Sequence, residues 1–115
     1  MSARSPITTH VLDTALGRPA QGVALILERR NEGTWTELAR GLTDSDGRCA
    51  TLLPPGNIQA GTYRLHFALE SYFAASGRES FYPEASVVFR VAAAEEHYHV
   101  PLLLAPFAYS TYRGS

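Results

Sequence analysis

Lysine is missing from this 115-residue sequence: its ten basic residues are all arginine, and they face eleven Asp and Glu. Without lysine the chain can form neither a lysine Schiff base nor a phosphate-binding P-loop, because both need the lysine amine. The formal net charge of −1 leaves no basic excess for contacts with phosphates. We therefore expect no nucleic acid among its partners.

Disulfides and long apolar runs are also absent. Cys49 is the only cysteine, so no disulfide can form within the chain. No stretch approaches the roughly 18 apolar residues that a membrane span needs, and we expect no membrane partner. Residues 1–6 lack the long apolar core of a secretory signal. These absences favour a cytoplasmic protein.

What is present fits one globular domain. A chain of 115 residues of which 45% are hydrophobic has the size and composition of a single domain with one core. We therefore expect residues 1–115 to form one domain.

Apolar and polar residues alternate with a period of two through most of the chain, which predicts β-strands. The strands are expected over residues 7–13, 23–29, 34–38, 49–53, 61–69, 85–91, 97–104 and 107–112. A break in the alternation predicts one short helix over residues 70–76, with Gly77 ending it. Pro101 cannot donate to a ladder, so it should mark an edge or a bulge. Short strands with regularly spaced turns are typical of an all-β sandwich.

Three histidines are candidates for chemistry. His97 and His99 share one face of a predicted strand, because residues two apart point the same way, and His10 lies in the first strand. A His₃ zinc site is one interpretation of this set, but no Cys-rich or carboxylate-rich neighbourhood supports a metal. A fourth histidine, His66, has nothing that distinguishes it from an ordinary structural residue.

Other candidate groups are weaker when each is taken alone. The chain has no Gly-x-Ser-x-Gly elbow, and Cys49 is more typical of a small buried hydrophobe than of a nucleophile. Arg48 follows the turn at residues 44–47, where its guanidinium would be held rigidly. Taken by itself, a surface ion pair with Asp44 or Asp46 is the simplest interpretation of Arg48.

Several segments together resemble the 5-hydroxyisourate hydrolases, a transthyretin-like family. The resemblance runs over nearly the whole chain. Its segments are Ile7-Thr8-Thr9-His10-Val11-Leu12-Asp13, Thr43-Asp44-Ser45-Asp46-Gly47-Arg48, His97-Tyr98-His99-Val100-Pro101-Leu102-Leu103-Leu104 and Tyr109-Ser110-Thr111-Tyr112-Arg113-Gly114-Ser115. The closing Tyr-Arg-Gly-Ser is the most specific, because transthyretin proper shares the fold but has a different tail and lacks the catalytic histidines.

The resemblance implies a transthyretin-like two-sheet β-sandwich of seven to eight strands with one short helix, formed by residues 1–115. It implies hydrolysis of the lactam ring of 5-hydroxyisourate, a product of urate oxidation, to 2-oxo-4-hydroxy-4-carboxy-5-ureidoimidazoline without a cofactor or metal. It also implies a homotetramer, a dimer of dimers with active sites in the channel between dimers. The catalytic residues it implies are His10, Arg48 and His99, and the residues lining the substrate site are Tyr112, Arg113, Gly114 and Ser115.

Amide hydrolysis needs a base that activates water and positive charge where an oxyanion develops. An imidazole, with an ordinary pKa of ~6.5, suits the base. Our hypothesis makes His99 the base and keeps it neutral beside Arg48. His10 would position or protonate the substrate, and Arg113 would attract its anionic ring. A short tail frays unless it is held, so we expect a neighbouring subunit to hold it.

Two alternatives remain open from the sequence. One is a transthyretin-like carrier that binds small molecules without chemistry, and the other is an accessory β-sandwich module. A carrier pocket should be mostly apolar, which leaves His10, Arg48 and His99 without a role. An accessory module leaves the aromatic and cationic tail without one.

Overall fold

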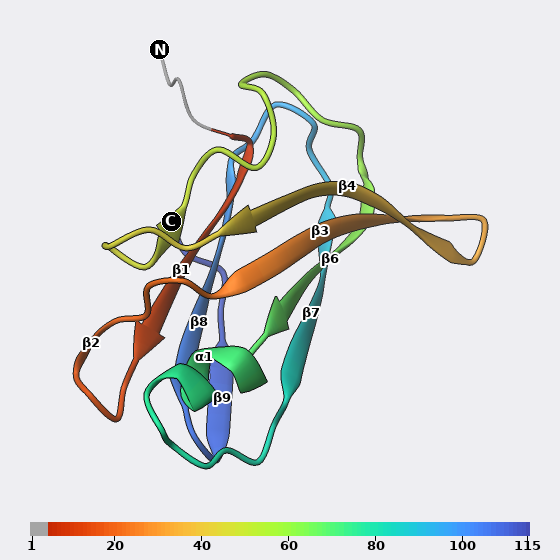
Figure 1. Ribbon diagram of the computed structural model, residues 1–115. Coiled ribbons are helices and arrows are strands. Elements are labelled where there is room, and N and C mark those ends of the chain that lie inside the picture. Colours follow the sequence, from red (N-terminus) through yellow and green to blue (C-terminus); the bar gives the residue numbers. More distant parts are fainter. Residues whose placement is uncertain (1–4) are drawn as a thin grey trace.

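In the computed structural model, which describes residues 5–115, two β-sheets pack against each other (Figure 1). The first sheet has the order β2-β1-β8-β9, with β5 also pairing with β1, and the second has the order β4-β3-β6-β7. The elements are β1 (Ile7–Asp13), β2 (Arg18–Pro19), β3 (Ala24–Asn31), β4 (Thr34–Leu42), β5 (Arg48–Cys49), β6 (Gly61–Ala68), α1 (Glu70–Ala75), β7 (Glu84–Val91), β8 (Tyr98–Ala105) and β9 (Ala108–Thr111). The predicted transthyretin-like sandwich with one short helix is confirmed.

Residues 1–4 lie outside the described residues. They make up most of residues 1–6, the segment in which we expect no secretory signal. Across residues 5–115, no helix has the length and the apolar character needed to cross a bilayer.

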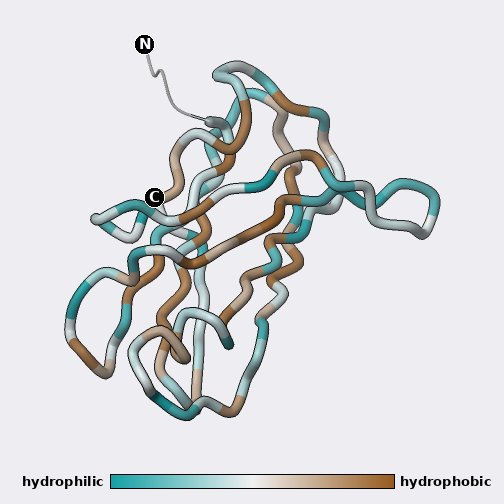
Figure 2. The backbone as a smooth tube through the Cα atoms, viewed as in Figure 1, coloured by the Kyte–Doolittle hydropathy of each residue, from teal (hydrophilic) through white to brown (hydrophobic). Residues whose placement is uncertain are grey.

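The core lies between the sheets because alternate residues of each strand point inward. Hydrophobic stretches occur along the strands of both sheets, whereas the β3–β4 turn is hydrophilic (Figure 2). Each large side chain buried in this way stabilises the fold by roughly 1.5–3 kcal/mol. The largest fully buried side chains are those of Tyr63, Phe67, Phe73, Ile7, Leu25, Leu27, Leu65, Leu69, Leu102, Leu104, Val11 and Val23.

Most predicted elements occur near their predicted bounds, with differences at three strands. The strand expected over residues 34–38 extends to Leu42. The strand expected over residues 49–53 is only Arg48–Cys49, because the chain bends away before Pro54. The two-residue strand β2 was not predicted, since it has no alternation of its own and exists by pairing with Leu12 and Asp13. Short strands of this kind carry little sequence signal.

Pro101 does not lie on an edge strand, because β8 is paired with β1 on one side and β9 on the other. The expectation of an edge was wrong. The ladder to β9 runs up to Leu102 and Thr111, and pairing resumes only at the isolated bridge between His99 and Gly114. Pro101 therefore marks a gap in the ladder, which suits a residue without an N–H.

The pairing of β1 with β8 is parallel, although the two strands lie at opposite ends of the chain. Thr8 lies beside His99 in this register, and His10 lies beside Pro101. The short strand β5 pairs with β1 in the antiparallel sense and places Arg48 next to His10. Three segments far apart in the sequence thus meet on one sheet.

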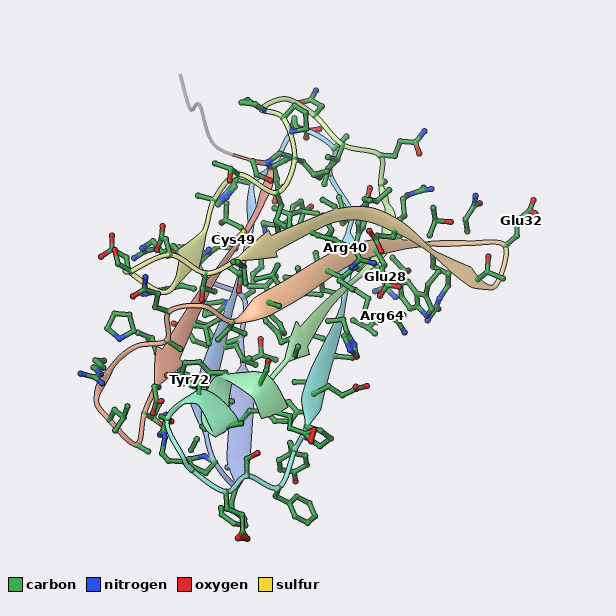
Figure 3. All side chains as sticks on the ribbon, in the orientation of Figure 1. Glu28, Glu32, Arg40, Cys49, Arg64 and Tyr72 are labelled. Atoms are coloured by element: carbon green, nitrogen blue, oxygen red, sulfur yellow. The ribbon has the colours of Figure 1, made fainter. Side chains whose placement is uncertain are left out.

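A buried carboxylate fastens α1 to the end of β1. Asp13 is fully buried and accepts hydrogen bonds from Tyr72 Oη (2.7 Å), Arg78 Nη2 (2.7 Å) and the Leu16 backbone N–H (3.0 Å). In Figure 3, Tyr72 is labelled on α1. Burial alone would raise the pKa of Asp13, but the hydrogen bonds from Arg78 and Tyr72 outweigh it and hold that pKa below its usual range.

Replacing Tyr72 by Phe is expected to lower the free energy of unfolding by about 1.5 kcal/mol at pH 7, because one hydrogen bond to a buried charge is lost. The bond favours the ionised carboxylate and depresses the folded-state pKa of Asp13. Its contribution is therefore present above the unfolded pKa of about 3.9 and is lost as pH falls through the lower folded value. Urea unfolding at pH 7 and pH 3 measures this. Tyr82→Phe, at an exposed site, is the control, and an equal difference at both pH values would contradict the assignment.

Candidate active site

The face of the first sheet that points away from the core carries the predicted catalytic residues. In β1, Ile7 and Val11 are buried in the core, so Thr8 and His10 point outward. The cross-strand partner of His10 is Arg48, and the partner of Thr8 is His99. Cross-strand neighbours share a face, so the two histidines and the arginine lie on the same side of the sheet.

These side chains line one open pocket of about 430 Å³. The C-terminal tail closes one side of it, and in Figure 1 the C-terminal end lies close to β1. The lining residues are Thr8, Thr9, His10, Arg48, Ala50, His99, Tyr112, Gly114 and Ser115. The structure thus brings together all the predicted site residues except Arg113.

The tautomer of His10 follows from its partner. Its Nε2 lies 2.9 Å from the backbone oxygen of Asp46 in the turn before β5. A carbonyl oxygen only accepts hydrogen bonds, so Nε2 carries the hydrogen and donates it. In the neutral ring, Nδ1 therefore holds the lone pair.

Arg48 does not pair with either neighbouring aspartate. One carboxylate oxygen of Asp44 accepts the backbone N–H of Asp46 (2.9 Å) and of Arg48 (3.0 Å), which fixes the turn. Within residues 5–115 the guanidinium of Arg48 takes part in no ion pair. The simplest interpretation of Arg48 from sequence, a surface ion pair, is therefore wrong. The exposed guanidinium can receive an anionic group in the pocket.

His99 is held through a threonine that the sequence did not single out. The hydroxyl of Thr8 lies 2.8 Å from His99 Nδ1 and 3.0 Å from His97 Nε2. The two rings lie 6.3 Å apart and 17° from parallel. Only parity pointed to Thr8, because it lies two residues from His10 on the same face.

The tail is anchored by contacts within its own chain, and the expectation that a neighbouring subunit holds it stays a prediction. The Gly114 N–H donates to the His99 carbonyl at 2.8 Å. Arg113 pairs with Glu96 at 3.0 Å, and its guanidinium lies 4.6 Å from the centre of the Tyr98 ring. Arg113 therefore points into a smaller adjoining pocket and not into the one that His10 and Arg48 line.

The remaining candidates lie elsewhere. The thiol of Cys49 is buried, and this burial raises its pKa, which disfavours the reactive thiolate. His66 lies on the second sheet, with Nδ1 2.7 Å from the Ser86 hydroxyl. Among residues 5–115, no group of three or more His, Cys, Asp or Glu is placed to hold a metal ion.

The fold and the pocket define a class: a transthyretin-like β-sandwich whose outer sheet face carries histidine and arginine around an open pocket. The sequence model of the HIUase/Transthyretin family matches residues 7–114. The chain belongs to this family.

The relatives include both hydrolases and transthyretins. The chain is 52% identical to mouse 5-hydroxyisourate hydrolase over 113 residues, covering 96% of each. The solved structure of Klebsiella pneumoniae 5-hydroxyisourate hydrolase is 39% identical, with a TM-score of 0.83 over 95% of this chain and 98% of that one. Sea bream transthyretin in complex with thyroxine is 36% identical, with a TM-score of 0.88 over 96% and 95% of the two chains. The backbone is therefore close to both groups, and side chains must separate them.

Proposed function

We propose that this chain is a 5-hydroxyisourate hydrolase that opens the lactam ring of its substrate as a cyclic amidohydrolase. The observation that carries the proposal is the meeting of His10, Arg48 and His99 in one open pocket. The 52% identity to mouse 5-hydroxyisourate hydrolase over nearly the full chain supports the same substrate.

Each group of the pocket has a role in the proposed reaction. His99 removes a proton from water as the water attacks the lactam carbonyl, and it gives this proton to the ring nitrogen as the carbon–nitrogen bond of the ring breaks. Arg48 stabilises the oxyanion that develops on that carbonyl, since no carboxylate of residues 5–115 forms an ion pair with its guanidinium. His10, held by the Asp46 carbonyl, orients the substrate by accepting a hydrogen bond on its Nδ1. The proposed reaction uses no cofactor and no metal.

The tail completes the proposed site. Tyr112, Gly114 and Ser115 line the pocket, where Tyr112 offers a phenol and Ser115 a hydroxyl to the substrate. We assign Arg113 an indirect task in place of direct binding: its contacts with Glu96 and Tyr98 hold the tail so that its neighbours face the pocket.

A carrier function is the alternative, because sea bream transthyretin is described in complex with thyroxine. A pocket for an apolar ligand is lined mainly by hydrophobic side chains with a few polar groups. In this chain the pocket holds two histidines, an arginine, two threonines and a serine. The lining therefore supports hydrolysis over carriage.

Assembly and context belong to the same proposal. We propose that residues 1–115 form one domain that assembles as a homotetramer, a dimer of dimers, and acts in the cytoplasm in urate breakdown. The outer edges of β7 and β9 have no partner strand within the described chain. Phe107 and Val88 lie exposed near these edges, and a symmetric partner strand would cover both features.

The decisive experiment generates 5-hydroxyisourate from urate with urate oxidase and follows its decay. Adding this protein is expected to accelerate the decay in proportion to its concentration, because the pocket supplies a base and an oxyanion partner. Heat-denatured protein is the control. Decay that keeps its spontaneous rate at every protein concentration would remove the proposed function.

A further inference from the structure

Thr8 lies between two imidazole rings and links them through its hydroxyl. Its hydroxyl is 2.8 Å from His99 Nδ1 and 3.0 Å from His97 Nε2. The residue is only 4% exposed, so these rings provide its hydrogen-bonding partners in place of bulk water. Such a hydroxyl links the protonation of the two rings.

A hydroxyl has one hydrogen to donate and two lone pairs that accept. If Thr8 donates to His97 Nε2, then the hydrogen bond to His99 requires a hydrogen on His99 Nδ1. If Thr8 donates to His99 Nδ1, then His97 Nε2 must carry the hydrogen. A third arrangement, in which both rings donate, leaves the Thr8 hydrogen to find another acceptor. The tautomers of the two histidines are therefore coupled.

We propose that Thr8 and His97 are positioning residues that set the tautomer of His99. His97 Nε2 accepts the Thr8 hydrogen, the Thr8 oxygen accepts the hydrogen on His99 Nδ1, and the lone pair of His99 is left on Nε2. This rests on the proposed function, in which His99 is the base. A base must present a lone pair, and the opposite tautomer would present an N–H on Nε2.

The other side of the His99 ring is confined as well. A Cβ atom on Gly114 would lie 2.5 Å from His99 Cδ2, so the tail passes directly against the ring edge next to Nε2. The Gly114 N–H also binds the His99 carbonyl. Thr8 on one side and Gly114 on the other leave the ring little freedom to rotate, so the tautomer decides which atom meets the water.

The test compares variants that remove the Thr8 hydroxyl or its acceptor while keeping the shape of the side chain. Thr8→Val keeps the side-chain shape but removes the hydroxyl, and His97→Phe keeps a ring but removes the acceptor. Both are expected to lower kcat on the order of 10²-fold, the low end of the contribution of a general base, with KM changed less than about 2-fold. Thr8→Ser keeps the hydroxyl and should restore kcat to within about 3-fold of the parent. The control is Thr14→Val, which removes a hydroxyl bonded to Leu104 of the same strand β8.

The tautomer is measured directly by ¹⁵N NMR of the ligand-free protein at pH 8. His99 should carry its hydrogen on Nδ1, and in His97→Phe it should shift to Nε2, because Thr8 then donates to Nδ1. An Nε2–H form of His99 in the parent protein would overturn the proposal, as would a Thr8→Val variant with parental kcat. If Thr8→Val does not fold, His97→Phe and the spectra decide. The spectra need no substrate, so they still test the coupling if the parent protein proves inactive on 5-hydroxyisourate.

Discussion

Deleting Tyr112 to Ser115 is expected to abolish acceleration of 5-hydroxyisourate decay while lowering the free energy of unfolding by only about 1 kcal/mol. The segment contributes three of the nine residues that line the pocket, so the site loses one of its sides. Its anchors are weak by comparison: one backbone hydrogen bond from Gly114, one exposed ion pair at Arg113, and the contact of the Arg113 guanidinium with the Tyr98 ring. The decay assay and urea unfolding measure the two effects separately.

A single substitution tests the same point without shortening the chain. In Gly114→Ala the new Cβ would stand 2.5 Å from His99 Cδ2, too close for any real contact, so the tail or the ring must move. Turnover should fall while the circular dichroism spectrum and the solution mass remain those of the parent. A tail deletion that turned over normally would show that the pocket proposed here is not the active site. A deletion that unfolded the protein would contradict the small stabilisation assigned to the tail.

Strand content was predictable because each strand obeys a local rule. β1, β6 and β7 bury one face more deeply than the other, and period-two alternation records that difference. β9 is exposed along its whole length, so its place in the sheet comes from its pairing with β8. Short β2 and β5 exist only through pairing with β1, and no local pattern reports a partner.

The parallel pairing of β1 with β8 is what the sequence could not supply by physical rules. The two strands are separated by most of the chain, and the alternation of apolar and polar residues does not indicate which strands become neighbours. Parity alone placed His97 with His99 on one face. It did not place His10 beside Arg48, nor Thr8 beside His99. The resemblance to a family brought these residues together, and the register now gives the physical reason.

The C-terminal tail shows that a resemblance to a family can also group residues that the structure separates. Its residues were selected from the resemblance as one group, yet the structure divides them: Gly114 and Ser115 face the pocket and Arg113 faces Glu96. Tyr112 and Gly114, the neighbours of Arg113, both line the pocket, as alternation along an extended segment predicts, so a motif read as one unit need not act as one.

His99→Asn is the substitution that distinguishes the roles of the two histidines. It is expected to lower kcat by roughly 10²–10⁴-fold, because an amide cannot take a proton from water at neutral pH. His10→Asn should mainly raise KM, since the Asp46 carbonyl already holds the Nε2 hydrogen of His10 and the ring serves to orient the substrate. Steady-state kinetics on 5-hydroxyisourate measures both.

The matched control is His66→Asn, the same change in a histidine of the second sheet that bonds Ser86, and it should leave the rate unchanged. If His99→Asn turned over normally while His10→Asn did not, the roles would be exchanged. The base would then be His10 Nδ1, the atom on which the Asp46 carbonyl leaves the lone pair. Either result assigns the base to a nitrogen whose lone pair is set by a fixed partner: the Asp46 carbonyl for His10, or Thr8 and His97 for His99. These partners therefore decide which nitrogen of each histidine can take the proton from water.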